Sequence, residues 1–208
     1  MKNIGKVMMT LAVVAMLVVA TCACFVGCGQ EETTTRLEAE YAKITDGRVD
    51  SKEDCVSNKF FVVGATEGGF GPEYTKPVVV QFDFNSTEEC EAKIVICVMS
   101  GNTFGNEFEL TDADYLFYLN GEKLGVPASV VDYEGNPTTK VPKEDFLAGT
   151  GSVYMTYNVT LKEGANTFAW KYETGKGAFK FDYIDITGKT VITWEEDHTL
   201  VDAFEPMM

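Results

Sequence analysis

Three carboxylates near the two ends of the chain could bind a metal ion together. Glu38 and Glu40 alternate within residues 36–42, which we expect to form a strand that places both side chains on one face. Asp182 stands in residues 179–186, where aromatic and β-branched residues predict a late strand. A carboxylate in such a run is costly to bury unless a cation or hydrogen-bond donors meet it. If the first and last strands are neighbours, the three carboxylates converge, and their hard oxygen ligands suit calcium.

The rest of the chain predicts an all-β domain that would bring these ends together. Asn120 and Gly121 predict a hairpin turn, residues 142–147 could form one helical turn, and no long stretch has helical periodicity. Eight or so short strands favour a β-sandwich, and among sandwiches a jelly roll. With a short additional strand at 191–194, the expected strands are 36–42, 59–63, 78–84, 92–99, 114–119, 153–161, 166–172 and 179–186.

Residues 1–27 have the pattern of an export signal. Two lysines precede a long apolar run, and no acidic residue occurs before Glu31. Residues 25–28 resemble a bacterial lipobox, in which Cys28 would receive a diacylglycerol lipid. The alternative is an uncleaved membrane anchor, because the run is nearly long enough to span a bilayer. Both interpretations place the protein outside the cytoplasmic membrane, and residues 28–35 would tether the domain to it.

The composition limits the kinds of partner. The chain has 32 acidic and 17 basic side chains and a net charge of −15. Such a protein lacks the basic surface that binds nucleic acid or anionic lipid headgroups. The chain beyond the signal is long enough for one domain with a good core. Its oligomeric state is left open.

Three cysteines follow the lipobox, and an odd number cannot all pair within one chain. Cys55, Cys90 and Cys97 could form one disulfide and leave one thiol, or they could all be buried thiols, which we favour. The sequence has no Cys-x-x-Cys motif, which argues against a zinc ribbon or a redox pair.

Several short motifs follow one another in a characteristic order between residues 36 and 187. Leu-Glu-Ala-Glu opens the stretch at 37–40, Leu-Lys-Glu-Gly-Ala-Asn occupies 161–166, and Phe-Asp-Tyr-Ile closes it at 181–184. In this order they resemble the galactose-binding-like jelly rolls of family 6 and family 35 carbohydrate-binding modules. The resemblance implies non-catalytic binding of a polysaccharide or oligosaccharide, and a structural calcium that joins the first strand to the last through Glu38, Glu40 and Asp182.

The resemblance also implies a sugar-binding cleft in the loops at one end of the sandwich. Phe70, Tyr74 and Phe146 are the candidate aromatic rings, and each could instead fold over the edge of the core. Lys180 stands where the family often has an asparagine, two residues before the closing aspartate. Because a lysine donates but cannot accept hydrogen bonds, it would favour an acidic sugar such as a uronate.

Catalytic motifs are scarce, so we expect no enzyme. His198 is the single histidine and lies in an acidic C-terminal extension, residues 188–208, and no Gly-x-Ser-x-Gly motif occurs. The sequence leaves open whether the loop cleft or a face of the sandwich binds the ligand. The alternative to a sugar-binding lipoprotein is a structural or protein-binding module of the cell surface that has lost its sugar cleft.

Overall fold

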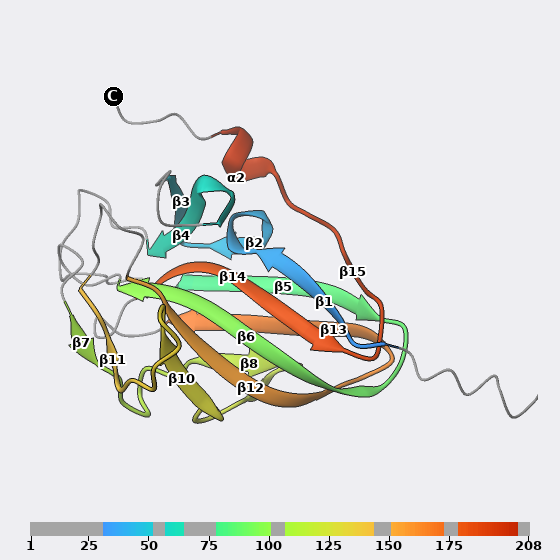
Figure 1. Ribbon diagram of the computed structural model, residues 1–208. Coiled ribbons are helices and arrows are strands. Elements are labelled where there is room, and N and C mark those ends of the chain that lie inside the picture. The colour runs from blue at the N-terminus through green and yellow to red at the C-terminus, as the bar shows by residue number, and fades with distance from the viewer. Residues whose placement is uncertain are drawn as a thin grey trace, which may run out of the picture. The chain divides into compact units, whose positions relative to one another are not determined.

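The computed structural model of the protein describes residues 31–51, 57–64, 78–100, 107–143, 151–172 and 179–203. They form two facing antiparallel sheets and a small strand pair (Figure 1). The first sheet contains β1 (Thr33–Glu38), β3 (Gly47–Ser51), β4 (Phe60–Gly64), β6 (Cys90–Ser100), β10 (Ser129–Asp132), β12 (Val153–Leu161) and β14 (Phe179–Gly188). The second contains β2 (Lys43–Thr45), β5 (Val78–Ser86), β8 (Phe117–Leu119), β9 (Glu122–Lys123), β13 (Gly164–Tyr172) and β15 (Ile192–Trp194). The pair is β7 (Phe108–Glu109) and β11 (Lys140–Val141).

The strand order confirms the predicted all-β sandwich. The first sheet runs β10-β12-β6-β14-β4-β3 with β1 beside β14, and the second runs β15-β5-β13-β8-β9 with β2 beside β5. Strands β4, β5 and β6, and later β12, β13, β14 and β15, alternate between the two sheets along the chain. This alternation between sheets is the connectivity of a jelly roll.

The core lies between the sheets and is rich in aromatic rings. Side chains alternate along β5, where Phe82 and Phe84 face inward while Asp83 and Asn85 face outward. Phe181 of β14 stacks on Trp170 of β13, with 5.6 Å between the ring centroids. Rings from both sheets therefore meet in one apolar layer between the sheets.

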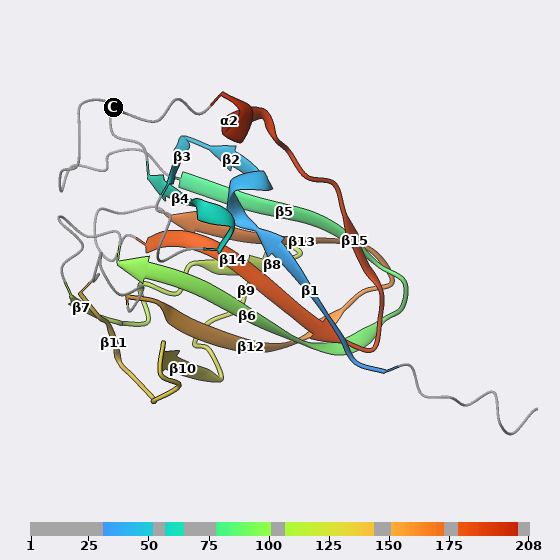
Figure 2. The same cartoon turned by 45° about the horizontal axis from the view of Figure 1, so that its top comes forward.

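The first and last strands of the domain lie side by side, as predicted (Figure 2). β1 pairs antiparallel with β14, so that Glu38 is opposite Tyr183 and Arg36 is opposite Asp185. Arg36 donates two hydrogen bonds of 2.8 Å to the Asp185 carboxylate, and its guanidinium lies 3.6 Å from the centroid of the Tyr183 ring. Such bidentate pairing adds geometric specificity, and here it fixes the register of the two strands.

The predicted strand over residues 36–42 is wrong in its second half. β1 ends at Glu38, and residues 39–41 form a 3-10 helix, η1 (Ala39–Tyr41). Glu38 and Glu40 therefore do not alternate along one strand. The predicted strand at 114–119 shortens to β8, and β3 was not predicted because Arg48 and Asp50 give it a polar composition. The additional strand near 191–194 is confirmed as β15.

The hairpin turn at Asn120 and Gly121 is confirmed. Both residues have positive φ angles, 51° and 85°, which suit the mirror-image turn that joins β8 to β9. The helical turn was predicted at residues 142–147, of which 142 and 143 are not helical and 144–147 lie outside the described residues.

The described cysteines are free thiols. Cys97 is buried, as predicted, whereas Cys90 is partly exposed, because it begins β6 at the rim of the sandwich. Cys55 lies outside the described residues. Of the helices in the described ranges, none is long and apolar enough to cross a membrane; residues 1–30, which include Cys28, are not among those ranges.

Candidate functional site

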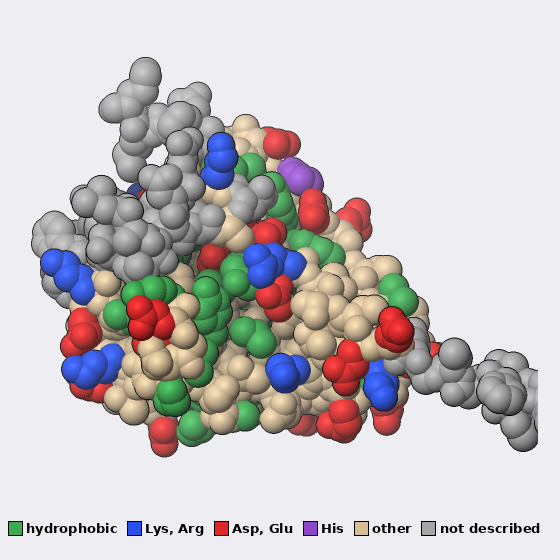
Figure 3. All heavy atoms as spheres, in the orientation of Figure 1, with side chains coloured by type: hydrophobic (Ala, Val, Ile, Leu, Met, Phe, Trp, Pro, Cys, Tyr) green, Lys and Arg blue, Asp and Glu red, His purple; other side chains and the backbone are tan. Residues whose placement is uncertain are grey.

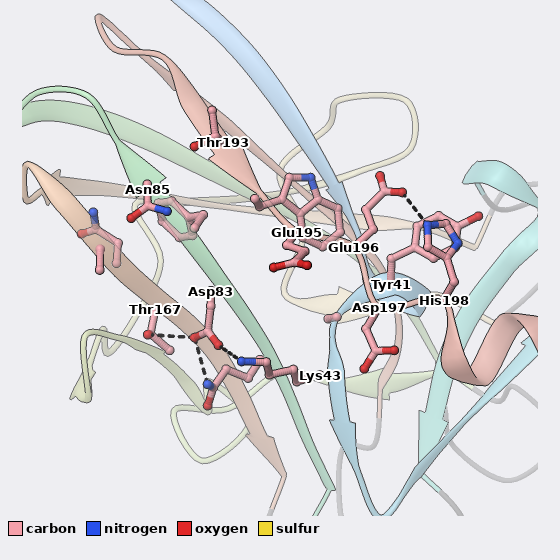
Figure 4. Close-up of a pocket in the computed structure, with 16 residues that line it drawn as sticks. Tyr41, Lys43, Asp83, Asn85, Thr167, Thr193, Glu195, Glu196, Asp197 and His198 are labelled. Atoms are coloured by element: carbon pink, nitrogen blue, oxygen red, sulfur yellow. Dashed lines mark hydrogen bonds and ion pairs between the residues drawn. The ribbon is translucent and has the colours of Figure 1, made fainter.

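A pocket of about 670 Å³ opens on the outer face of the second sheet (Figure 4). Its floor consists of outward-facing side chains of β5, β13 and β15, which are adjacent strands of that sheet. The strand period of two creates this floor, because every second residue of β5 is buried in the core and the residues between face outward. The floor residues are Gln81, Asp83, Asn85, Ala165, Thr167 and Thr193.

Residues 195–198, which we call the tail wall, form one side of the pocket. They follow β15 directly and are held against η1, because the backbone N–H of Asp197 donates to the carbonyl oxygen of Tyr41 at 2.8 Å. The His198 ring lies 4.5 Å from the Tyr41 ring, and its Nε2 is 3.0 Å from a carboxylate oxygen of Glu196. The short helix α2 (Thr199–Asp202) continues from this wall and contacts η1.

A polar network centred on Asp83 crosses the floor. Lys43 Nζ lies 2.5 Å from one carboxylate oxygen, and the other oxygen accepts hydrogen bonds from Gln81 Nε2 at 2.9 Å and from Thr167 Oγ1 at 3.0 Å. Partial burial raises the pKa of Asp83, but these donors and the lysine charge outweigh it and hold the pKa below its ordinary value. Asp83 therefore remains an ionised acceptor, although its charge is neutralised locally by Lys43.

Aromatic rings border the polar floor. Trp194 lines the pocket and is half-buried, because its ring packs against Phe82 of the core, with 6.0 Å between centroids. Tyr41 lines the pocket from η1 on the side of the tail wall. The pocket thus combines indole and phenol surfaces with the amide of Asn85 and several hydroxyl groups.

Asp182 occupies a second site, on the other sheet. The pairing of β14 with β6 shifts by one residue between Phe181 and Tyr183, so Asp182 is the extra residue of a β-bulge. The side chain is 2% exposed. It accepts hydrogen bonds from the Ser57 backbone N–H, at 3.2 Å to both oxygens, and from Ser57 Oγ at 2.9 Å.

The predicted convergence of Glu38 with Asp182 is observed. The same Ser57 hydroxyl also contacts Glu38 Oε2, so one serine bridges the two carboxylates. Burial raises the pKa of Asp182 to about 7, and the nearby charge of Glu38 adds to this effect. Burial also raises the pKa of Glu38. Two acids that both resist ionisation in the folded protein are a site where a cation would be stabilising.

Glu40 follows Glu38 by two residues and is fully buried in η1. Within the parts of the chain that the structure describes, however, no group of three or more Asp, Glu, His or Cys side chains is arranged to hold a metal ion. The donors in place are thus two carboxylates and the serine hydroxyl between them. Calcium prefers six to eight oxygen ligands, so a calcium shell would need further oxygens, and the calcium site stays a prediction.

Most of the predicted loop cleft lies outside the described residues. Phe70, Tyr74 and Phe146 lie outside the described residues. Lys180 lies on β14 opposite Met99 of β6, is nearly buried, and places its Nζ 5.3 Å from the centroid of the Phe61 ring. It does not line the pocket on the second sheet.

That sheet-face pocket was not predicted from the sequence. One signal was visible, since Gln81, Asp83 and Asn85 are polar and alternate with the buried residues of a predicted strand. The other half of the pocket comes from residues 195–198, whose acidic composition is typical of a solvated tail. Only the folded structure shows that this tail turns back over the sheet.

The structure is similar to those of several solved carbohydrate-binding modules. The CBM35 module from Cellvibrio japonicus Abf62 is 17% identical with a TM-score of 0.49, and the match covers 79% of this chain and 99% of that one. A family 35 module from Clostridium thermocellum is 14% identical with a TM-score of 0.45, covering 74% and 97%. A Xyl-CBM35 module, solved with a disaccharide that contains glucuronic acid, is 18% identical with a TM-score of 0.47, covering 76% and 96%.

No protein-family model matches the sequence, and no curated protein matches it. These solved structures are modules of family 35, one of the two families that the sequence motifs resemble.

Proposed function

We propose that this protein binds a polysaccharide or oligosaccharide without catalysing its cleavage. The observation that carries this proposal is the pocket on the second sheet, whose volume of about 670 Å³ falls in the usual range for small-ligand sites. A sugar ring has an apolar face of C–H groups and a rim of hydroxyls. The pocket offers a surface for each, because Trp194 and Tyr41 provide rings while the floor provides amides, hydroxyls and carboxylates.

The arrangement suits hydroxyl recognition in particular. Asn85 is exposed on the floor, and its amide can donate and accept at the same time, as a sugar hydroxyl does. Asp83 is held in one orientation by three donors, so it is already positioned before a ligand arrives. Trp194 is fixed by its contact with Phe82. Preorganised groups of this kind lose little conformational entropy on binding.

The alternative, a protein-binding surface module, has weaker support. A protein interface would be expected to show a contiguous apolar patch. Within the described ranges the exposed large hydrophobic side chains come from separate positions in the chain, at Val126, Tyr133, Val191 and Leu200. The concave polar pocket therefore favours a sugar over a protein partner.

Replacing Trp194 with alanine should weaken glycan binding at least roughly tenfold, because its indole is one of the aromatic surfaces that line the pocket. The measurement is binding of the full-length protein, in detergent, to a broad glycan array. Tyr133→Ala, which removes a half-exposed ring elsewhere, should bind as the wild type does, and Trp194→Phe should retain most binding. Equal binding by Trp194→Ala would exclude this pocket, and a blank array for the wild type would favour the protein-binding alternative.

We also propose that calcium binds at Glu38 and Asp182 and stabilises the junction of β1 and β14. The support is the buried carboxylate of Asp182 and the partly buried carboxylate of Glu38 on neighbouring strands, bridged by Ser57. Glu40, two residues after Glu38 and within η1, is the third candidate ligand. A bound cation would favour the ionised form of both acids, whose pKa values burial raises.

The location of the protein follows from its N-terminal pattern. We propose an extracytoplasmic protein anchored to the bacterial cell membrane by a lipid on Cys28. Cys28→Ala should therefore release the protein from the membrane fraction, as measured by fractionation and immunoblotting. Cys24→Ala is the matched control, because Cys24 is preceded by a poorer lipobox, and it should leave the protein in the membrane. A Cys28→Ala variant that stays fully membrane-bound would indicate the uncleaved anchor.

A further inference from the structure

The pocket on the second sheet is strongly acidic. Asp83, Glu195, Glu196 and Asp197 line it, against a single lysine and a single histidine. Figure 3 shows acidic side chains beside His198, the only histidine of the chain. A pocket that holds several like charges is most stable with a positively charged occupant.

The ion pairs in the pocket show which of these charges remain for a ligand. Lys43 forms an ion pair with Asp83, and a carboxylate oxygen of Glu196 contacts Nε2 of His198. In the described part of the chain no Lys or Arg forms an ion pair with Glu195 or Asp197. Both carboxylates act on Lys43 and raise its pKa, after the larger effect of Asp83, so their field reaches the floor.

The orientations of the tail side chains support this division. In Figure 4 the Glu195 carboxylate points from the tail toward the strand that carries Asp83 and Asn85, whereas the Glu196 carboxylate points away from that strand to His198. Asp197 accepts a hydrogen bond from the Thr199 backbone N–H at 3.0 Å, which fixes its position and lowers its pKa. The wall thus presents carboxylate oxygens to the pocket from a defined backbone.

We propose that the tail wall makes the pocket select sugars that carry a protonated amine, such as a hexosamine without its acetyl group, over neutral sugars and uronates. This inference rests on the proposed sugar-binding function and names its ligand class. An ammonium group placed between Glu195 and Asp197 would gain two unneutralised carboxylates, whereas a uronate would be repelled by them. Lys43 cannot compensate, because Asp83 already neutralises it.

This charge preference is opposite to that expected of the loop cleft, where Lys180 would favour an acidic sugar. The two sites can therefore be distinguished by ligand charge alone. The preference also assigns a role to residues 195–198, since the floor without them keeps only the neutralised pair of Lys43 and Asp83.

The test compares three oligosaccharides of equal length with the full-length protein in detergent, at about pH 6, where the sugar amine is protonated. The probes are a β-1,4-linked glucosamine oligomer, its fully N-acetylated counterpart and an oligogalacturonate. The glucosamine oligomer should bind roughly fivefold more tightly than the acetylated one, and the oligogalacturonate should bind most weakly. Isothermal titration calorimetry or biolayer interferometry would give the three affinities.

A cationic oligomer could also be attracted to the protein as a whole, whose net charge is −15, so the variants must separate the two effects. Glu195→Gln and Glu122→Gln each remove one negative charge, but Glu122 is exposed on β9, at the opposite edge of the same sheet. Glu195→Gln should reduce the preference for the free amine roughly two- to fivefold, and Glu122→Gln should leave it unchanged.

Equal effects of the two substitutions would overturn the inference, because the preference would then come from overall charge. Equal binding of the glucosamine and acetylated oligomers, with both lost in Trp194→Ala, would overturn it too while sugar binding at the pocket remained. No binding of any of the three would overturn it as well, and a blank glycan array in addition would overturn the proposed function itself.

Discussion

Replacing Phe181 with alanine should lower the free energy of unfolding by about 3–5 kcal/mol. Phe181 is fully buried, and its ring stacks on Trp170. Its ring centroid lies 5.9 Å from that of Phe82 and 6.3 Å from that of Phe117. These partners come from the second sheet, so the substitution opens a cavity at the centre of the sandwich. Surrounding residues can close it only partly, because strands on both sides are fixed by their hydrogen-bond ladders.

Chemical denaturation followed by tryptophan fluorescence would measure the loss, and Trp170 reports from the affected layer. Phe181→Leu should lose less, since it leaves a smaller cavity. Tyr133→Ala is the control for removal of an aromatic ring at the surface, where the residue is 45% exposed, and it should change stability by no more than about 0.5 kcal/mol. A loss below about 1 kcal/mol for Phe181→Ala would mean that the sheets do not pack through this layer.

Much of this fold could be predicted because most of its strands have a clear local sequence pattern. β12 was predicted at its observed bounds, since Val153–Leu161 alternates cleanly between core and surface. β5, β6, β13 and β14 were predicted within two residues of each end. The pairing of the first strand with the last was the condition for the carboxylates to converge and was implied by the family resemblance, and it is observed.

The errors fall where tertiary contacts override local pattern. Alternation in residues 36–42 continues beyond Glu38, yet the chain turns into η1, where Ala39 and Glu40 are buried. Arg48 and Asp50 give β3 a polar sequence without a clear strand pattern. β3 is an edge strand and pairs only with β4. Edge strands often carry charged residues because one of their sides is unpaired, so their sequences resemble loops.

The sheet-face site was harder to predict than the fold. Its floor follows from strand periodicity, but its tail wall depends on the contact of Asp197 with Tyr41, which joins residues 156 positions apart in the chain. No local pattern encodes such a contact. By contrast, Asp182 could be singled out from the sequence, because an acid amid apolar strand residues is conspicuous, and the structure shows the donors that it needs.

In the absence of calcium, the stability of the wild-type protein should fall as the pH rises from about 4 to about 7. The pKa of Asp182 is about 7 in the folded protein, raised first by burial and then by Glu38, against 3.8 as its ordinary value. Between these values the folded state holds a proton that the unfolded state has released. The stability from this protonation is therefore fully present below about pH 4 and is lost as the pH rises to about 7.

The size of this change follows from the pKa difference. A difference of about three units corresponds to about 4 kcal/mol, and the true change should be somewhat smaller, because a charged Asp182 would draw water or ions toward itself. Glu38, whose pKa is also raised, contributes with the same sign. Other carboxylates act in the opposite direction, among them Asp132, whose pKa hydrogen bonds from Asn136 lower. A variant is thus needed to isolate the contribution of Asp182.

Asp182→Asn removes the titration and keeps an acceptor for Ser57. Without calcium, the variant should equal the wild type near pH 4 and exceed its stability by about 2–4 kcal/mol above pH 7. Denaturation curves at several pH values, recorded in excess chelator, would measure the difference. A difference that does not change with pH would contradict the raised pKa of Asp182.

Calcium should reverse this dependence if it binds at Glu38 and Asp182. The ion binds the ionised carboxylates of the folded state, so its stabilisation grows as the pH rises. In excess calcium the wild type should therefore become more stable than in chelator, most of all above pH 7, while Asp182→Asn should gain little. If calcium leaves the wild type unchanged at every pH, the calcium site is contradicted, and Glu38 and Asp182 are then stabilised by protons and by the shared Ser57 hydroxyl.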